Sequence, residues 1–337
     1  MTELLGLVLL SFIITSFFMV PFIDLLYYLR KKYKRPIPKG YDDSGTPIHN
    51  KLLAGKDIET PVGGGILLIL IVTVLIISYY NFSDLNQRKE LWILIFTFLS
   101  FGAIGLLDDF KKIFTAFSGK FAGIRARFVF GLQIVFATIV GFQLYNIIGL
   151  NNIYIAGLGN FIIGSWYIPL AAFVIVAFSN AYNISDGLDG LSSGLLVVSL
   201  FALLALASAT LNLPLATFIG IWLGSLFAFL YFNVYPARIY LGDAGALSFG
   251  ATLAVVGLLM GKILALAIIG GMFVVIITTS LIQIFSKIFF KRKIFTIAPL
   301  HMWLRFIGWE EPKIVMRLWL AQALFAIFGL WLALLSK

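Results

Sequence analysis

The sequence lacks cysteine altogether and is poor in charge. The absence of cysteine among 337 residues excludes disulfide bonds, thiolate metal sites and thiol nucleophiles. Charged residues make up 12% of the chain, whereas roughly 25% is usual in soluble domains. The P-loop and HExxH patterns are also absent, so the usual sequence support for a nucleotide-driven motor or a zinc hydrolase is missing. The composition excludes an ordinary soluble domain.

Apolar residues, in contrast, make up 61% of the chain and occur in long unbroken runs. Runs such as ILLILIVTVLIISYY have the continuous apolarity of membrane-spanning helices and not the alternation of β-barrel strands. We therefore expect an all-α polytopic membrane protein, a single domain over residues 1–337, with about ten transmembrane helices. The expected spans are 3–29, 62–80, 91–107, 126–148, 162–179, 194–211, 215–233, 246–261, 264–285 and 314–335.

The basic residues are distributed unevenly between the expected spans. If the N-terminus faces outward, 21 of the 25 Lys and Arg residues fall in the loops on the opposite side of the membrane. Cytoplasmic loops carry the excess of positive charge in membrane proteins, so we expect both termini outside and the basic loops in the cytoplasm. The net charge of +10 is then a topology signal, and no nucleic-acid partner is expected. The first apolar segment has no small-residue cleavage site and is expected to be a retained span.

Acidic residues gather on the same expected face. Five of the fifteen lie at predicted cytoplasmic ends of spans: Asp108, Asp109, Asp186, Asp189 and Asp243. A lipid transporter, the alternative from another functional class, would more often place ionisable groups near the bilayer midplane. The pattern therefore favours chemistry at the membrane surface.

The first acidic motif is GLLDDFKKI, in which Asp108 and Asp109 end a span and Lys112 follows one helical turn after Asp108. Adjacent carboxylates repel one another unless a cation or a proton intervenes, so the pair indicates Mg²⁺ or a positioned acid or base. A polar helix end with local Asp–Lys pairing is the alternative interpretation.

The second motif is NAYNISDGLDGLSSG, at residues 180–194. Asn180 and Asn183 are three residues apart, as are Asp186 and Asp189, and each pair would share one face if the segment were helical. Amides both donate and accept hydrogen bonds, which suits a nucleobase or sugar hydroxyls. A turn rich in helix-capping residues is the alternative.

Two further polar segments follow. In YFNVYPARIYLGDAGALSFG, Asn233 ends one span and Asp243 precedes the next, where a carboxylate would cap a helix or bind Mg²⁺ beside a diphosphate. The segment KRKIFTIAPLHMWLRFIGWEEPK contains His301, interpreted either as a phosphate contact or as a surface hydrogen-bonding residue. The other histidine, His49, lies in a basic loop without comparable context.

Together with TPVGGG at 60–65, these segments resemble the motifs of the polyprenyl-phosphate N-acetylhexosamine-1-phosphate transferases. The segment Lys293–Trp319 is most similar to the phospho-N-acetylmuramoyl-pentapeptide-transferase (MraY) branch. The resemblance implies ten transmembrane helices in the bacterial cytoplasmic membrane, with the active site on the cytoplasmic face. It also implies transfer of a phospho-N-acetylhexosamine, foremost phospho-MurNAc-pentapeptide, from a UDP-sugar to undecaprenyl phosphate for peptidoglycan synthesis. UMP is the implied by-product, Mg²⁺ the implied cofactor, and a homodimer a possible assembly.

The resemblance assigns roles to individual residues as well. Asp243 is implied as the metal ligand, and Asp108 and Asp109 as catalytic residues near the lipid phosphate and further candidate ligands. Asp108 is compatible with a base or with a positioning group, since a phosphate is already largely ionised near neutral pH. The implied substrate-binding residues are Lys112 for phosphate, Asn180, Asn183, Asp186, Asp189 and Asn233 for the nucleoside side, Gln283 for uracil, and His301.

The chain also departs from this branch. Met302 and Trp303 stand where the branch has the second and third of three consecutive histidines, and Arg305 stands where it has an acidic residue. Val129 replaces a lysine, and Val62 replaces the middle threonine of a TPTMGG pattern. These changes leave the core transfer motifs intact but bear on the donor. The alternative function is a UDP-GlcNAc:undecaprenyl-phosphate GlcNAc-1-phosphate transferase that initiates another cell-envelope polysaccharide.

Overall fold

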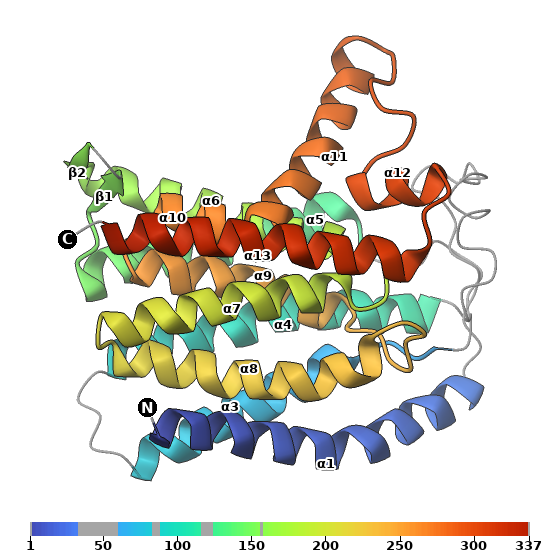
Figure 1. Cartoon of the computed structure of the whole chain (residues 1–337), viewed down its shortest axis with the longest axis horizontal. Coiled ribbons are helices and arrows are strands. Elements are labelled where there is room, and N and C mark those ends of the chain that lie inside the picture. The colour runs from blue at the N-terminus through green and yellow to red at the C-terminus, as the bar shows by residue number, and fades with distance from the viewer. Residues whose placement is uncertain (1, 33–59, 83–87, 116–123, 156–157, 336–337) are drawn as a thin grey trace.

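The computed structural model describes residues 2–32, 60–82, 88–115, 124–155 and 158–335. They fold mainly into helices that lie alongside one another in a bundle (Figure 1). The longer helices are α1 (Thr2–Lys32), α3 (Gly64–Phe82), α4 (Arg88–Thr115), α5 (Ala126–Gln143), α6 (Tyr167–Ser185), α7 (Leu191–Ala209), α8 (Leu213–Asn233), α9 (Asp243–Leu259), α11 (Gly271–Phe289) and α13 (Glu311–Leu335). The shorter elements are a π-helical turn (Leu144–Ile148), β1 (Asn152–Ile155), β2 (Gly159–Ile162), a 3-10 turn (Gly164–Trp166), α10 (Ile263–Ile269) and α12 (Leu300–Phe306).

Eight of the described helices are long and apolar enough to cross a membrane, namely α1, α4, α5 with the turn that continues it, α6, α7, α8, α11 and α13. Helices α3 and α9 are apolar but have shorter apolar lengths. A helix thus lies at each of the predicted positions, and the chain is a polytopic helical membrane protein. The start of α1 and the end of α13 lie at the same end of the bundle (Figure 1).

Helix α9 forms the buried centre of the bundle. Every residue from Ala244 to Leu259 is buried, as expected for a helix that is apolar on all sides. The Phe98 ring of α4 stacks on Phe249 with centroids 5.5 Å apart, and Trp222 of α8 lies edge-on to Phe249 at 5.3 Å. The Ser248 hydroxyl donates to the Phe98 carbonyl at 2.7 Å. This packing on every side fixes the N-terminus of α9, where Asp243 lies.

The prediction of one unbroken span at 264–285 is wrong. The segment divides into α10 and α11 at Gly270, and Gln322 of α13 bonds both sides of the break. Its amide oxygen accepts from the backbone N–H of Met272 at 3.0 Å, while its amide nitrogen donates to the Ile269 carbonyl and to the Ser199 hydroxyl. In an apolar environment, the backbone N–H and C=O groups at a helix break need hydrogen-bond partners within the protein. Gln322 supplies such partners and so stabilises the break.

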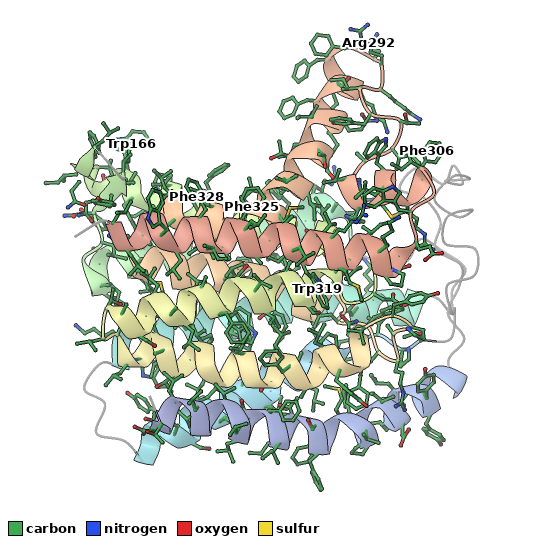
Figure 2. All side chains as sticks on the ribbon, viewed as in Figure 1. Trp166, Arg292, Phe306, Trp319, Phe325 and Phe328 are labelled. Atoms are coloured by element: carbon green, nitrogen blue, oxygen red, sulfur yellow. The ribbon has the colours of Figure 1, made fainter. Side chains whose placement is uncertain are left out.

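Beyond this break α11 projects away from the bundle (Figure 1), and Figure 2 shows Arg292 just past its tip. The chain then returns to α12, which lies beside the first turn of α13 (Figure 1). The last polar segment is therefore an ordered return toward the bundle, with His301 on α12.

The expectation of a purely helical chain is also wrong at one place. Strands β1 and β2 pair antiparallel in a hairpin, with Asn152 opposite Ile162 and Ile155 opposite Gly159. The helix predicted to begin at residue 162 begins at Tyr167, because the second strand and the 3-10 turn occupy the residues before it. The hairpin lies at the end of the bundle where the chain termini lie (Figure 1).

Candidate functional site

The predicted acidic motifs of α4 and α9 meet at one point in the bundle. The carboxylate Oδ2 of Asp109, a residue 8% exposed, accepts a hydrogen bond of 3.1 Å from the backbone N–H of Ala244 in the first turn of α9. Asp243 is the first residue of that helix and is half-buried. Two carboxylates therefore lie in or against the N-terminal turn of α9, where the helix dipole favours negative charge.

A close approach of the two helices makes this meeting possible. Gly105, one turn before Asp109, lies so near α9 that an added Cβ would overlap the carbonyl group of Asp243. At Gly242 the backbone has a φ of +84°, and a Cβ would lie 2.9 Å from Oδ2 of Asp109. Glycine at these two positions therefore sets the distance between the DD and GDAG motifs.

Asp108 precedes Asp109 in the same turn of α4 and is half-buried. Its Oδ1 accepts a hydrogen bond of 2.6 Å from the backbone N–H of Ile124, at the start of the segment that leads into α5. Helix α4 continues past the acidic pair to Thr115. Lys112 thus belongs to this helix, but its side chain lies outside the described part of the structure, as does His49.

The TPVGGG segment docks beside the same acidic turn. The backbone N–H groups of Gly63 and Gly64 donate to the Tyr240 carbonyl at 3.1 and 3.0 Å, and the N–H of Gly65 donates to Leu241 at 2.8 Å. The Thr60 hydroxyl donates to the Ala237 carbonyl at 3.1 Å. These bonds hold the TPVGGG segment against the loop that precedes Asp243. The structure thus brings together two motifs that the resemblance linked only by their sequence pattern.

The DGLDG segment forms a turn, so Asp186 and Asp189 do not share a helix face as they would if the segment were helical. Helix α6 ends at Ser185 with Asp186 as its C-terminal cap, and α7 starts after Gly190, whose φ of +75° favours glycine. Oδ1 of Asp186 accepts from the Ser192 hydroxyl at 2.5 Å. The half-buried Asp186 is therefore held against the first turn of α7.

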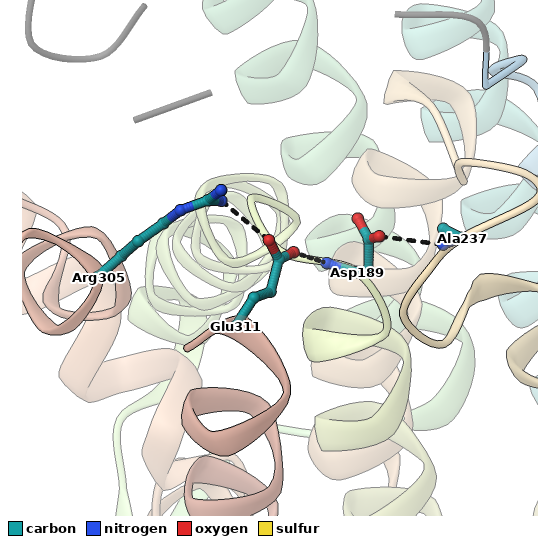
Figure 3. Close-up of polar contacts among 4 residues, drawn as sticks. All are labelled: Asp189, Ala237, Arg305 and Glu311. Carbon is teal, nitrogen blue, oxygen red and sulfur yellow. Dashed lines mark hydrogen bonds and ion pairs between the residues drawn. The ribbon is translucent and has the colours of Figure 1, made fainter. Parts of the chain in front are cut away.

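Asp189 ties this turn to two other parts of the chain (Figure 3). Its Oδ2 accepts a hydrogen bond of 3.0 Å from the backbone N–H of Ala237, in the loop that follows α8. Its own backbone N–H donates to Oε1 of Glu311, the first residue of α13, at 2.7 Å. The other carboxylate oxygen of Glu311 pairs with Nη1 of Arg305 at 2.9 Å.

Three of the predicted amides brace loops and helices. Asn233 accepts from the Ser193 hydroxyl at 3.1 Å and donates to the Ile239 carbonyl at 2.9 Å. Asn180 donates to Gln133 of α5 at 2.7 Å. Gln283 donates to and accepts from the backbone of Phe295, each at 2.9 Å, and so holds the loop after α11. Asn183, in contrast, is half-buried near the end of α6.

His301 is 1% exposed, which contradicts the interpretation of a surface residue. Its imidazole lies against the DGLDG turn, because a Cβ added at Gly187 would be 2.6 Å from Nε2 of His301. Met302 beside it is also buried, while Trp303 is exposed. The histidine is therefore packed directly beside the turn that carries Asp186 and Asp189.

The structure divides the predicted site residues into two kinds. Asp109, Asp189 and Asn233 are buried and hold backbone segments in place, whereas the half-buried acidic groups are Asp108, Asp186 and Asp243. Gln283 lies on the projecting α11 and bonds Phe295 in the loop that follows it. The sequence interpretation missed the partners of these residues. Ser193 bonds Asn233, Ser192 bonds Asp186, and Glu311, which is paired with Arg305, bonds Asp189.

The carboxylates of Asp108, Asp109 and Asp243 offer oxygen ligands of the type that Mg²⁺ prefers. Over the described residues, no group of three or more His, Cys, Asp or Glu side chains is arranged to hold a metal ion by itself. A Mg²⁺ site commonly uses only one or two carboxylates and completes its shell with water and substrate phosphates. Asp243 and its neighbours on α4 fit that kind of site, and metal binding stays a prediction.

Comparison with known proteins gives the family. Residues 91–261 match the model of glycosyl transferase family 4, a range that includes the DD motif, the DGLDG turn and Asp243. The chain is 34% identical to a phospho-N-acetylmuramoyl-pentapeptide-transferase of Pelagibacter ubique, over 94% of this chain and 90% of the relative. It is 33% identical to one of Thermodesulfovibrio yellowstonii, over 96% and 90%, and 34% identical to one of Borreliella afzelii, over 80% of both chains. The chain therefore belongs to glycosyl transferase family 4, and within it to the group of the phospho-N-acetylmuramoyl-pentapeptide-transferases.

Proposed function

We propose that this protein transfers phospho-N-acetylmuramoyl-pentapeptide from its UDP-activated form to undecaprenyl phosphate, releasing UMP, for peptidoglycan synthesis. The observation that carries the proposal is the meeting of the DD motif with the first turn of α9, joined by the bond from Ala244 to Asp109. The similarity to relatives named for this reaction, over nine-tenths of the chain, supports the same function.

The reaction joins two anions. An oxygen of the lipid phosphate forms a bond to the β-phosphorus of the UDP-sugar, and the bond from that phosphorus to the oxygen bridging to the α-phosphate breaks, so that UMP leaves. The phosphate nucleophile is largely ionised near neutral pH and needs little deprotonation. The protein's main task is therefore to orient the two substrates and to offset their repulsion.

We assign this task to the residues around the start of α9. Asp243 would hold Mg²⁺, with Asp108 and Asp109 as neighbouring carboxylates, and bound Mg²⁺ would neutralise charge that develops on the diphosphate. Asp109 positions the first turn of α9 through Ala244. Lys112, one helical turn beyond Asp108, would contact phosphate.

The DGLDG turn would form the donor side of the site. Asn183 and Asp186 are half-buried beside it, and His301 packs against Gly187 at its centre. We propose that these side chains contact the uridine and sugar. Asn180, Asp189, Asn233 and Gln283 were also predicted to bind donor, and their bonds to other parts of the chain support a bracing role.

We place this site on the cytoplasmic face of the bacterial cytoplasmic membrane. The eight long apolar helices and the shorter α3 and α9 would together make ten crossings, with both termini outside. The excess of Lys and Arg in the loops on the side of Asp108 and Asp243 supports this orientation. We also propose to test for a homodimer by measuring the oligomeric state of the protein.

A donor comparison tests the proposal. Purified protein in liposomes with undecaprenyl phosphate would be given UDP-MurNAc-pentapeptide or UDP-GlcNAc, with Mg²⁺ or with excess EDTA. We expect UMP release with the pentapeptide donor and Mg²⁺ only. Turnover of UDP-GlcNAc alone would favour the initiating GlcNAc-1-phosphate transferase, and turnover of neither donor would refute both.

A further inference from the structure

A buried carboxylate connects the C-terminal part of the chain to the DGLDG turn. Glu311 is 6% exposed, although glutamate is almost never buried unless it is paired. Both of its carboxylate oxygens have partners, the Asp189 N–H at 2.7 Å and the Arg305 guanidinium at 2.9 Å (Figure 3). Such charge-assisted hydrogen bonds are stronger than bonds between neutral groups.

The connection runs through three elements, one of which is far from the other two in sequence. Arg305 lies in the last turn of α12, Glu311 begins α13, and Asp189 lies 122 residues earlier in the turn between α6 and α7. Asp189 then accepts from the N–H of Ala237, in the loop that leads to α9. Glu311 therefore bonds the backbone of the DGLDG turn directly, whereas Ala237 is bonded to the side chain of Asp189.

The geometry also gives Arg305 a specific task. A carboxylate taken out of water is costly unless its charge is compensated. Arg305 has a side chain 19% exposed and supplies the positive charge to the almost buried Glu311. Glu311 is also the first residue of α13, where the helix dipole favours negative charge. Arg305 thus supplies the counter-charge for a carboxylate that also accepts the Asp189 N–H.

We propose that Glu311, held by Arg305, is a positioning residue for the nucleotide-sugar. It fixes the Asp186–Gly190 turn in the conformation that binds donor and leaves the lipid-phosphate side of the site unaffected. The inference rests on the proposed function in one respect, namely that the turn contacts the donor. The effect on the turn itself does not depend on the reaction.

Neighbouring positions provide a matched set of variants. Glu311→Ala removes both bonds, Glu311→Gln keeps an acceptor for Asp189 but loses the charge, and Arg305→Met leaves the carboxylate without its counter-charge. The double variant Arg305→Met/Glu311→Gln removes both charges together. Glu310→Ala is the control, because Glu310 is an exposed glutamate adjacent to Glu311.

Three measurements separate positioning from a merely structural role. The first is hydrogen exchange of peptides that cover residues 186–190, and the second is the affinity for UMP by calorimetry. The third is kinetic and gives kcat with the KM for UDP-sugar and the KM for undecaprenyl phosphate. A variant that only lowers the amount of folded protein reduces the apparent kcat and leaves both KM values unchanged.

For Glu311→Ala we expect a rise of about tenfold in the donor KM and in the UMP dissociation constant, from loss of a buried charge-assisted bond. The KM for undecaprenyl phosphate should change by less than about twofold, since that side of the site keeps its contacts. Exchange in 186–190 should become faster, Glu311→Gln should be intermediate, and Glu310→Ala should match the wild type. The double variant should bind UMP better than Arg305→Met, because it has no uncompensated buried charge.

Unchanged exchange and unchanged donor KM in folded Glu311→Ala would overturn the proposal, as would an equal rise in both KM values. If Glu311→Ala does not fold, the comparison of Arg305→Met with the double variant decides, and equal UMP affinities would refute the role. If the wild type neither releases nor binds UMP, the proposed function fails and the donor role fails with it. The exchange measurement then still establishes whether Glu311 holds the turn.

Discussion

The carboxylate of Asp109 lies on the N-terminal turn of α9, where it accepts the backbone N–H of Ala244 at 3.1 Å. The adjacent Asp243 begins that helix and is half-buried. Two carboxylates from motifs that are far apart in sequence thus share one helix end. Their different burial predicts that they contribute differently to stability and to activity.

Loss of the Asp109 carboxylate should destabilise the protein. Asp109→Ala removes an acceptor at a helix N-terminus, and we expect a loss of about 0.5–2 kcal/mol in the free energy of unfolding. Asp109→Asn keeps an oxygen acceptor and should lose less. Thermal unfolding in detergent measures the difference, and equal melting temperatures for both variants and the wild type would refute the capping role.

Asp243 should behave in the opposite way. Asp243→Asn keeps the size of a half-buried side chain and should shift the melting temperature little, yet UMP release should fall by about 100-fold or more through loss of charge stabilisation in the transition state. The assay is initial-rate UMP release at saturating Mg²⁺. Near-wild-type turnover by Asp243→Asn would remove it from the proposed catalytic residues.

The close approach of α4 to α9 predicts that Gly105 tolerates no side chain. A Cβ there would overlap the carbonyl group of Asp243, so Gly105→Ala should cost about 1–3 kcal/mol through overpacking and should also lower activity. Gly131→Ala is the matched control on α5, because a Cβ at Gly131 meets nothing within 4 Å. Calorimetric unfolding of both variants checks the prediction, which fails if they are equally stable.

The contact between His301 and Gly187 makes a further prediction. In Gly187→Ala the new Cβ would lie 2.6 Å from Nε2 of His301, so the imidazole must shift and the donor KM should rise, by about tenfold if one good contact is lost. Adding His301→Ala should relieve the overlap and restore the melting temperature without restoring activity. A melting temperature equally low in the single and double variants would argue against this contact.

Gln322 should hold the break between α10 and α11. Gln322→Leu leaves the Met272 N–H and the Ile269 carbonyl without this amide, and we expect a cost of about 1–3 kcal/mol for buried polar groups that lose their partner. Leu324→Ala on the same helix is the control, since Leu324 is 71% exposed. Unfolding in detergent should separate the two variants, and similar stabilities would contradict the role of Gln322.

The positions of the helices could be predicted from the sequence because each apolar run exceeds the length of a strand and is bounded by polar residues. The break after Ile269 could not, since the run of apolar residues continues through it and the stabilising Gln322 lies 53 residues away. The hairpin at 152–162 was missed because its short strands lie within an apolar stretch next to a helix.

The members of the site were predictable in type but not in role. Asp108, Asp109 and Asp243 were identified as one acidic group, yet nothing in the sequence distinguishes the buried Asp109 from the half-buried Asp243. Glu310 and Glu311 are adjacent and look alike, and only the start of α13 beside Asp189 buries one and exposes the other. A role that depends on burial in the tertiary structure can be assigned only when the fold is known.

The identity of the released nucleotide tests the central claim most directly. Protein in liposomes with UDP-MurNAc-pentapeptide, undecaprenyl phosphate and Mg²⁺ would be analysed for nucleotide and lipid product by mass spectrometry. Transfer of a phosphosugar predicts UMP and a lipid diphosphate-linked sugar in equal amounts, and neither with Asp243→Asn. Release of UDP with a lipid monophosphate-linked sugar would mean attack at the sugar carbon and would contradict the account.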